Sequence, residues 1–173
     1  MSKLRRRFGL LPLICCLLLV GSAVSFAQRQ FAHLEAGRPE VKVIMAGAVE
    51  REAGPVALDK VEAVKPGDVL RWNITSMNEG TASARDYKTV GHIPKGTTFI
   101  AGSAESENGS TVTYSIDGGK SFSTLPIIEE QQADGSVKKV AAPVSMYTEV
   151  RYEWSDALAA GSKLTASYKV RVR

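Results

Sequence analysis

Polar and apolar residues alternate along several short stretches of the chain, most clearly within residues 66–100. Leu70, Trp72 and Ile74 fall on one face of an extended chain, and polar residues occupy the positions between them. A period of two is typical of a strand that buries one face. Turn-forming residues interrupt the pattern twice, so the stretch divides into several strands. The predicted strands cover residues 69–75, 87–90 and 97–100, and the turns are Asn78-Glu79-Gly80 and Pro94-Lys95-Gly96.

The alternation is cleanest near the C-terminal end, where residues 148–154 and 163–172 each place apolar side chains at alternate positions. The turn-forming segment 156–161 joins these two stretches. We therefore predict that they are strands that pair antiparallel with each other. In that pairing Glu149 and Glu153 face basic residues on the neighbouring strand, which is a favourable cross-strand arrangement.

The remaining segments are also short and extended, and no long stretch has a helical period. Further strands are expected at residues 40–46, 56–64, 111–116 and 120–125, and residues 129–139 are read as a loop or an exposed hairpin. Short strands with Gly and Pro turns between them are typical of two packed sheets. The pattern predicts one all-β domain over residues 40–173, an Ig-like β-sandwich of about seven to nine antiparallel strands.

The first 27 residues have the composition of a secretory signal. A basic start from Lys3 to Arg7 precedes an apolar run, and small residues place the predicted cleavage after Ala27. Both cysteines of the chain lie in this leader, so the exported chain is expected to have no thiol and no disulfide. Residues 28–39 have little periodicity and are expected to be a flexible lead-in. We expect export by the general secretory route to the periplasm or the cell surface, with no stable membrane span after cleavage.

The net charge of +4 comes from the same leader. The leader holds Lys3, Arg5, Arg6 and Arg7, which leaves 22 − 4 = 18 basic residues against 18 acidic residues in the rest of the chain. Phosphate binding needs clustered positive charge, so this balance argues against a nucleic-acid partner.

Few residues have the spacing that chemistry requires. His33 and His92 are isolated and lack the ligand spacing of a transition-metal site. No nucleophile motif or phosphate loop is present, so the sequence predicts no catalytic residue, no metal and no cofactor. Asp117 lies in a Gly-rich turn that resembles the Asp-box hairpin of β-propellers, where it has a structural role. A calcium site at this turn is the less favoured alternative.

Two further groups of residues have competing interpretations. The aromatic residues on the apolar phase of their strands are predicted to be buried in the core, and a sugar-binding platform is the alternative. These residues are Trp72, Tyr152, Trp154 and Tyr168. Lys42 and Asn73 are candidates for an isopeptide crosslink, although the polar phase of Asn73 argues against its burial.

The order of the turn motifs resembles a known family. Pro66-Gly67-Asp68, Asn78-Glu79-Gly80 and Pro94-Lys95-Gly96 followed by Phe99 are similar to the conserved-repeat domain of bacterial and archaeal surface proteins, a domain of unknown function. The similarity covers roughly residues 41–173 in a single copy, and it continues through the segment VTYSIDGGKSF and the last two strands. The resemblance implies an Ig-like fold and a place on the cell surface or in the envelope.

These observations predict an exported, non-enzymatic Ig-like module with a structural or protein-interaction role in the bacterial cell envelope. Envelope or surface proteins are the expected partners. A carbohydrate-binding module and a small hydrolase with an unrecognised site are the alternatives, because sandwich folds host many functions.

Overall fold

Antiparallel β-structure dominates the computed structural model, which describes residues 37–173. The predicted leader and residues 28–36 of the predicted lead-in therefore lie outside the described residues. Two short 3₁₀ helices, η1 (Leu58–Lys60) and η2 (Val144–Met146), accompany the strands. The strands are β1 (Val41–Val49), β2 (Val56–Ala57), β3 (Val69–Asn78), β4 (Lys88–His92), β5 (Thr97–Phe99), β6 (Glu105–Ser106), β7 (Thr111–Ser115), β8 (Ile127–Gln131), β9 (Val137–Ala141), β10 (Glu149–Glu153) and β11 (Lys163–Val172).

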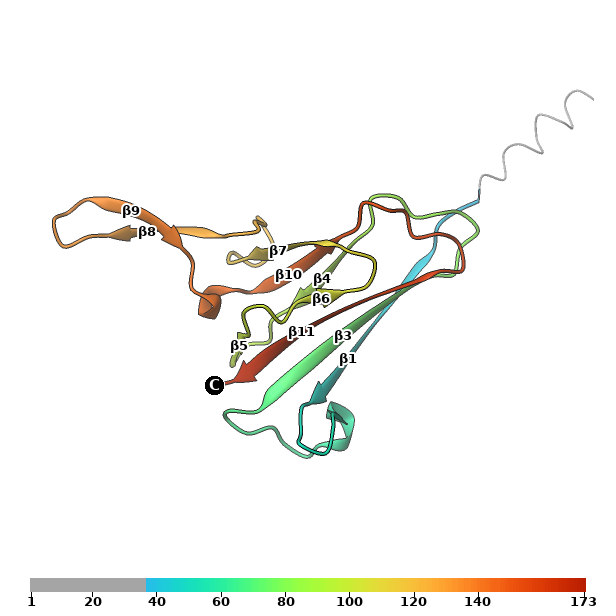
Figure 1. The fold of residues 1–173 in the computed structure, drawn as a ribbon, viewed down its shortest axis with the longest axis horizontal. Helices are drawn as coiled ribbons and strands as arrows, with labels where there is room; N and C mark the ends of the chain where they lie inside the picture. The colour runs from blue at the N-terminus through green and yellow to red at the C-terminus, as the bar shows by residue number, and fades with distance from the viewer. Residues whose placement is uncertain (1–36) are drawn as a thin grey trace, which may run out of the picture. The chain divides into compact units, whose positions relative to one another are not determined.

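Two sheets of unequal size face each other. The larger sheet has six strands in the order β2-β1-β3-β11-β5, with β6 also pairing β11. The smaller sheet has three strands in the order β4-β10-β7. Figure 1 shows β3 and β11 as long neighbouring strands at the centre of the larger sheet, with β1 beside β3. The predicted all-β sandwich is confirmed.

The core lies between the two sheets and is built from the alternating residues that the sequence marks as apolar. Tyr152 on β10 and Tyr168 on β11 have no exposed surface. The Tyr152 hydroxyl donates a hydrogen bond to the Ser167 carbonyl, and the Tyr168 hydroxyl donates to the His92 carbonyl. Because burial disfavours the charged phenolate, it raises the pKa of both tyrosines well above the ordinary value. Each hydroxyl thus forms a hydrogen bond to a strand of the facing sheet, while the ring fills the core.

The predicted pairing of the last two strands is wrong. β10 lies in the smaller sheet between β4 and β7, whereas β11 lies in the larger sheet between β3 and β5. The joining segment therefore crosses from one sheet to the other. Glu153 makes ion pairs with Lys88 on β4, at 3.0 Å, and with Arg151 on its own strand, and does not face β11. The apolar sides of β10 and β11 face each other across the core, which produces the same alternation that a shared sheet would produce.

Three shorter segments also differ from expectation. The segment predicted as a strand at 56–64 has strand structure only in β2, and η1 follows it. The segment predicted at 120–125 forms only an isolated bridge between Tyr114 and Ser123. The polar segment 103–110, where no strand was predicted, contains the two-residue strand β6. Residues 37–173 hold eleven strands, of which nine form the two sheets (six and three) and two, β8 and β9, form a separate pair.

The charged segment near residue 134 forms a hairpin, as one of the two interpretations predicted. β8 and β9 pair only with each other, and Asp134 and Ser136 lie in the connecting turn. In Figure 1 this hairpin extends away from the two sheets.

The two tryptophans have different environments. Trp154 is 4% exposed, and its Nε1 donates a hydrogen bond to the Glu107 carbonyl at 3.0 Å, so the prediction of a core residue is confirmed. Trp72 is only partly buried, although it lies on the inner face of β3. Its cross-strand neighbour on β1 is Gly47, and a Cβ at that position would lie within 3.1 Å of the ring, so the glycine leaves the space that the ring occupies. The exposure of the two rings differs because of their positions, since Trp72 lies beside β1, near the edge of the larger sheet.

Candidate functional site

Among residues 37–173, no strand pairs with the outer edge of β1 over most of its length. Glu79 N–H bonds to the Glu40 carbonyl beyond one end of β1, and Glu50 N–H bonds to the Val69 carbonyl beyond the other. Because the backbone groups of an antiparallel strand alternate in direction, the even-numbered residues of β1 point toward β3 and the odd-numbered residues point away from it. β2 pairs with β1 only at Ala48 and Val49. Within the described chain, residues 41–47 therefore present free N–H and carbonyl groups at 41, 43, 45 and 47.

Large apolar side chains flank this free edge. Val43, Ile44 and Met45 are 50%, 51% and 41% exposed, and Met77 on the adjoining strand is 38% exposed. Val43 and Met45 share the inner face with Ile74 and Ser76, their cross-strand neighbours on β3. The three-stranded sheet buries Ile74 but leaves Val43 and Met45 exposed. The unequal widths of the two sheets thus leave an apolar strip beside unpaired backbone. We call residues 41–47 the open β1 edge.

Within residues 37–173, this edge lacks most of the features that usually protect an edge strand. Exposed sheet edges are commonly shielded by charged side chains, prolines or a covering segment. The edge of β4 carries Lys88 and His92, and the edge of β7 is covered where Tyr114 and Ser123 exchange backbone hydrogen bonds. Along the open β1 edge the only charged residue is Lys42. The edge therefore has the composition of a surface that pairs with another strand.

A buried asparagine fixes the start of β1. Asn78 has no exposed surface, and its Oδ1 accepts hydrogen bonds from the N–H groups of Glu40 and Gly80, both at 3.1 Å. Its Nδ2 donates to the carbonyls of Ala82 and Leu158, at 2.7 and 3.0 Å. One side chain thus holds the beginning of β1, the turn after β3 and the crossing segment before β11. The turn motif that begins with Asn78 was identified from the sequence, but these bonds were not.

Ion pairs hold the other end of β1. The Glu50 carboxylate contacts Arg71 on β3 and Lys169 on β11, and the Arg71 hydrogen bond is the main cause that lowers its pKa. Arg51 donates two hydrogen bonds to Asp68, which lower the pKa of that carboxyl to about 2. These partly exposed pairs add little stability individually. Their effect is to keep the strand aligned with β3 up to its last residue.

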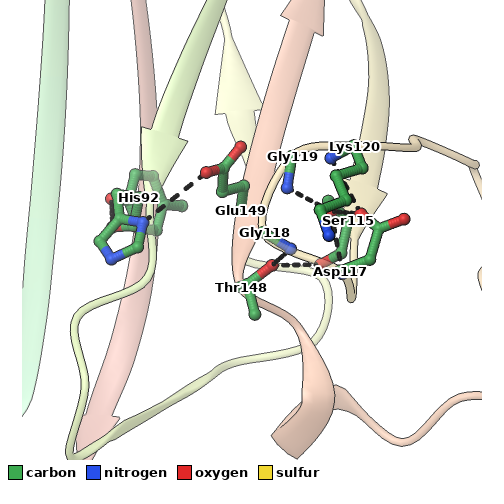
Figure 2. A network of polar contacts seen from close by, with 9 residues as sticks. His92, Ser115, Asp117, Gly118, Gly119, Lys120, Thr148 and Glu149 are labelled. Atoms are coloured by element: carbon green, nitrogen blue, oxygen red, sulfur yellow. Dashed lines mark hydrogen bonds and ion pairs between the residues drawn. The ribbon is translucent and has the colours of Figure 1, made fainter.

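Asp117, the candidate calcium ligand, is the centre of a closed turn (Figure 2). One carboxylate oxygen accepts hydrogen bonds from the Ser115 hydroxyl at 2.7 Å and from the N–H groups of Lys120 and Ser121, each at 3.0 Å. The other accepts a bond from the Ser121 hydroxyl at 2.6 Å. The bonds from Ser121 are the largest cause of a pKa far below the ordinary value, because they favour the ionised form. Asp117 is fully explained as a turn residue.

The same turn is attached to β10 rather than open to a ligand. The Thr148 hydroxyl accepts a hydrogen bond from the Gly118 N–H and donates to the Ser115 carbonyl, at 3.1 and 3.2 Å. Figure 2 also shows Glu149 directed toward His92, with 3.8 Å between its Oε1 and the histidine Nδ1. His92 therefore has a carboxylate neighbour within the chain, whereas His33 lies outside the described residues.

We predict that Asp117 makes stability depend on acid pH. Its folded-state pKa is lowered, so its contribution is complete above the unfolded value of 3.8 and is lost as pH falls from there toward the folded value. Urea unfolding of the natural chain and of Asp117→Asn, from about pH 5 to about pH 2, measures this. The asparagine keeps the acceptor oxygen but does not titrate, so its unfolding free energy should fall less. Parallel losses in the two proteins would contradict the assignment.

The other sequence candidates do not converge on a site. Tyr152 and Tyr168 have no exposed surface and Trp154 is 4% exposed, so these rings form no sugar-binding platform. Lys42 and Asn73 are both exposed, and their cross-strand neighbours are Met77 and Ala46 respectively, so the structure does not bring them together for a crosslink.

The described residues offer little else that resembles a reaction centre. Among residues 37–173 there is no cluster of three or more His, Cys, Asp or Glu side chains that would hold a metal. The surface hollows are shallow, and one of them runs along the outer face of β3 and β11. Its lining is polar and contains no aromatic ring; it consists of Asn73, Thr75, Glu105, Ser106, Glu107, Thr165, Ala166 and Ser167. No helix in the described part of the chain is long and apolar enough to cross a membrane.

Comparisons with known proteins give no indication of function, so the candidate site is judged from its geometry. No family model, no curated protein and no solved structure matches the chain. The sequence contained one signal for the open β1 edge that its analysis did not use. Residues 41–47, VKVIMAG, are almost uniformly apolar, whereas β3 and β11 alternate. A strand that is apolar on both faces cannot bury both of them at the edge of a sheet. Some of its apolar side chains therefore stay exposed.

Proposed function

We propose that this chain is a protein-interaction module that binds an extended segment of a partner along the open β1 edge. The observation that supports the proposal most directly is the free backbone of residues 41–47 next to the exposed side chains of Val43, Ile44 and Met45. The proposal includes the predicted export signal, so the module acts in the cell envelope or at the surface. It also retains the expectation of an Ig-like domain related to the conserved-repeat family.

The chemistry of strand addition accounts for both features of the edge. An added strand gains main-chain hydrogen bonds to the odd-numbered residues of β1, and these bonds carry affinity without requiring a particular sequence. Alternate side chains of the added strand then meet Val43 and Met45 on one face and Ile44 on the other. The partner segment is therefore expected to be extended and apolar at alternate positions.

A photo-crosslinking amino acid at position 44 tests the proposal in the cells that produce the protein. Position 44 is exposed at the centre of the edge. We expect one defined partner peptide to be crosslinked and identified by mass spectrometry. Val43→Pro removes an outward-pointing N–H, so this variant should lose the crosslink.

Val90→Pro is the matched control. Val90 is 42% exposed on the edge strand β4. Ile93 N–H bonds to the Thr148 carbonyl and Trp154 N–H to the Tyr87 carbonyl, so the N–H of Val90 points away from β10. This variant should keep the crosslink at position 44. An unchanged crosslink in Val43→Pro, or none in the natural chain, would refute the proposal.

A further inference from the structure

We infer that the strand bound by the open β1 edge is β1 of a second copy, paired antiparallel about a twofold axis at Ile44. The inference rests on the proposed function, because it names the partner for the same edge. A strand that pairs with its own copy must be self-complementary in three respects. Its free backbone groups, its side chains and its available length must all match after a twofold rotation.

The available length is symmetric about Ile44. β2 pairs with β1 at Ala48 and Val49, so an added strand meets free backbone only as far as Gly47. At the other end β1 begins at Val41. Ile44 is the midpoint of residues 41–47, so the twofold register about it uses the whole open length.

The free backbone groups also match in this register. Rotation about Ile44 sets Val41 opposite Gly47 of the second copy, and Val43 opposite Met45. All of these are odd-numbered residues whose N–H and carbonyl groups point outward. Each outward group therefore meets a partner, as an antiparallel ladder requires. Ile44 then lies opposite Ile44 of the second copy. These two residues exchange no backbone hydrogen bonds, and side chains are closest in pairs of this kind.

The side chains match without opposing like charges. Lys42, the only charged residue of the edge, lies opposite Ala46 of the second copy. Its own ion-pairing partner, Glu79, lies 3.7 Å away in the same chain. Val43 and Met45 face each other across the axis and continue the uncovered inner face from one copy to the next. The pairing thus sets the apolar strips of the two copies side by side, so that Val43 of one copy and Met45 of the other shield each other laterally.

The edge strand β4 is less suited to self-pairing. A twofold axis at Val90 on β4 sets Lys88 opposite His92 of the second copy. Both residues already contact carboxylates of their own chain, Glu153 and Glu149. Val90 is the one large apolar residue exposed on β4, whereas the open β1 edge exposes Val43, Ile44 and Met45. Exposed apolar surface therefore favours β1 as the edge that joins two copies.

Cysteine pairs test both the partner and the register. Lys42 and Ala46 of two copies form a pair without hydrogen bonds, in which side chains lie close enough for a disulfide. All variants carry Cys15→Ser and Cys16→Ser, so the introduced thiol is the only one. A mixture of Lys42→Cys and Ala46→Cys proteins should yield a disulfide-linked dimer under mild oxidation.

Each cysteine variant alone is the control for the mixture. In the proposed register two copies of position 42 are separated by four residues along the strand, roughly 13 Å. The single variants should therefore remain unlinked. Linkage in one of them that equals linkage in the mixture would overturn the register.

Light scattering after size exclusion tests the dimer itself. The natural chain and Val90→Pro should have the mass of two chains, and Val43→Pro should raise the dissociation constant at least about tenfold. If the natural chain is a monomer that still crosslinks a different protein at position 44, the self-pairing is wrong and the proposed function stands. If it is a monomer and nothing is crosslinked at position 44, both are wrong.

Discussion

Replacing Asn78 with aspartate should lower the unfolding free energy by at least about 3 kcal/mol. The two side chains have the same shape, but the Asn78 Nδ2 donates to the carbonyls of Ala82 and Leu158. A carboxylate oxygen at this buried position faces two acceptors and makes neither bond. Urea denaturation at neutral pH, followed by tryptophan fluorescence, measures the change.

Asn73→Asp is the matched control for this prediction. Asn73 lies on the same strand, but it is exposed and its side chain makes no hydrogen bond to the described residues. Its replacement should change the unfolding free energy by less than about 0.5 kcal/mol. Equal losses in the two variants would show that the bonds of Asn78 are not the cause.

Trp154→Ala should lower the unfolding free energy by about 3–5 kcal/mol. The indole is buried, stacks on Tyr87 and Tyr152 at centroid distances of 5.8 and 6.1 Å, and donates to the Glu107 carbonyl. Its removal leaves a cavity and an unpaired carbonyl. Equilibrium urea unfolding followed by far-UV circular dichroism gives the value, because the variant retains a single tryptophan.

Trp72→Ala serves as the comparison for Trp154→Ala. Trp72 is only partly buried, and its Nε1 has no hydrogen-bond partner within the described residues. The loss at Trp72 should therefore be smaller than the loss at Trp154. A larger loss at Trp72 than at Trp154 would mean that packing around Trp72 and β1 contributes more to the unfolding free energy than packing around Trp154. The burial of the two rings predicts the opposite.

Strand positions and buried faces were predictable because they depend on local alternation. Leu70 and Ile74 on β3 and Leu164 and Tyr168 on β11 are buried as their phase predicted. Sheet membership was not predictable in the same way. Alternation indicates which face of a strand is buried, but it does not distinguish a neighbour in the same sheet from a neighbour across the core. β10 and β11 were assigned to one sheet for this reason.

The candidate site was less predictable than the fold, because an open edge is a property of the sheet order. Residues 40–46 were correctly predicted to be extended, but the sequence does not state that β2 covers only Ala48 and Val49. Asn78 illustrates the same limit. Its turn motif is local, whereas its partner at Leu158 is 80 residues away.

The central claim is that residues 41–47 present a free strand edge that another strand pairs with. Residue-resolved amide hydrogen exchange by NMR, at increasing protein concentration, tests it directly. In dilute protein the amides of Val43 and Met45 should exchange fast, while those of Lys42 and Ile44, which point toward β3, are protected. At high concentration Val43 and Met45 should become protected as well. Protection of all four amides in dilute, monomeric protein would contradict the claim, because the edge would then be covered within the chain itself.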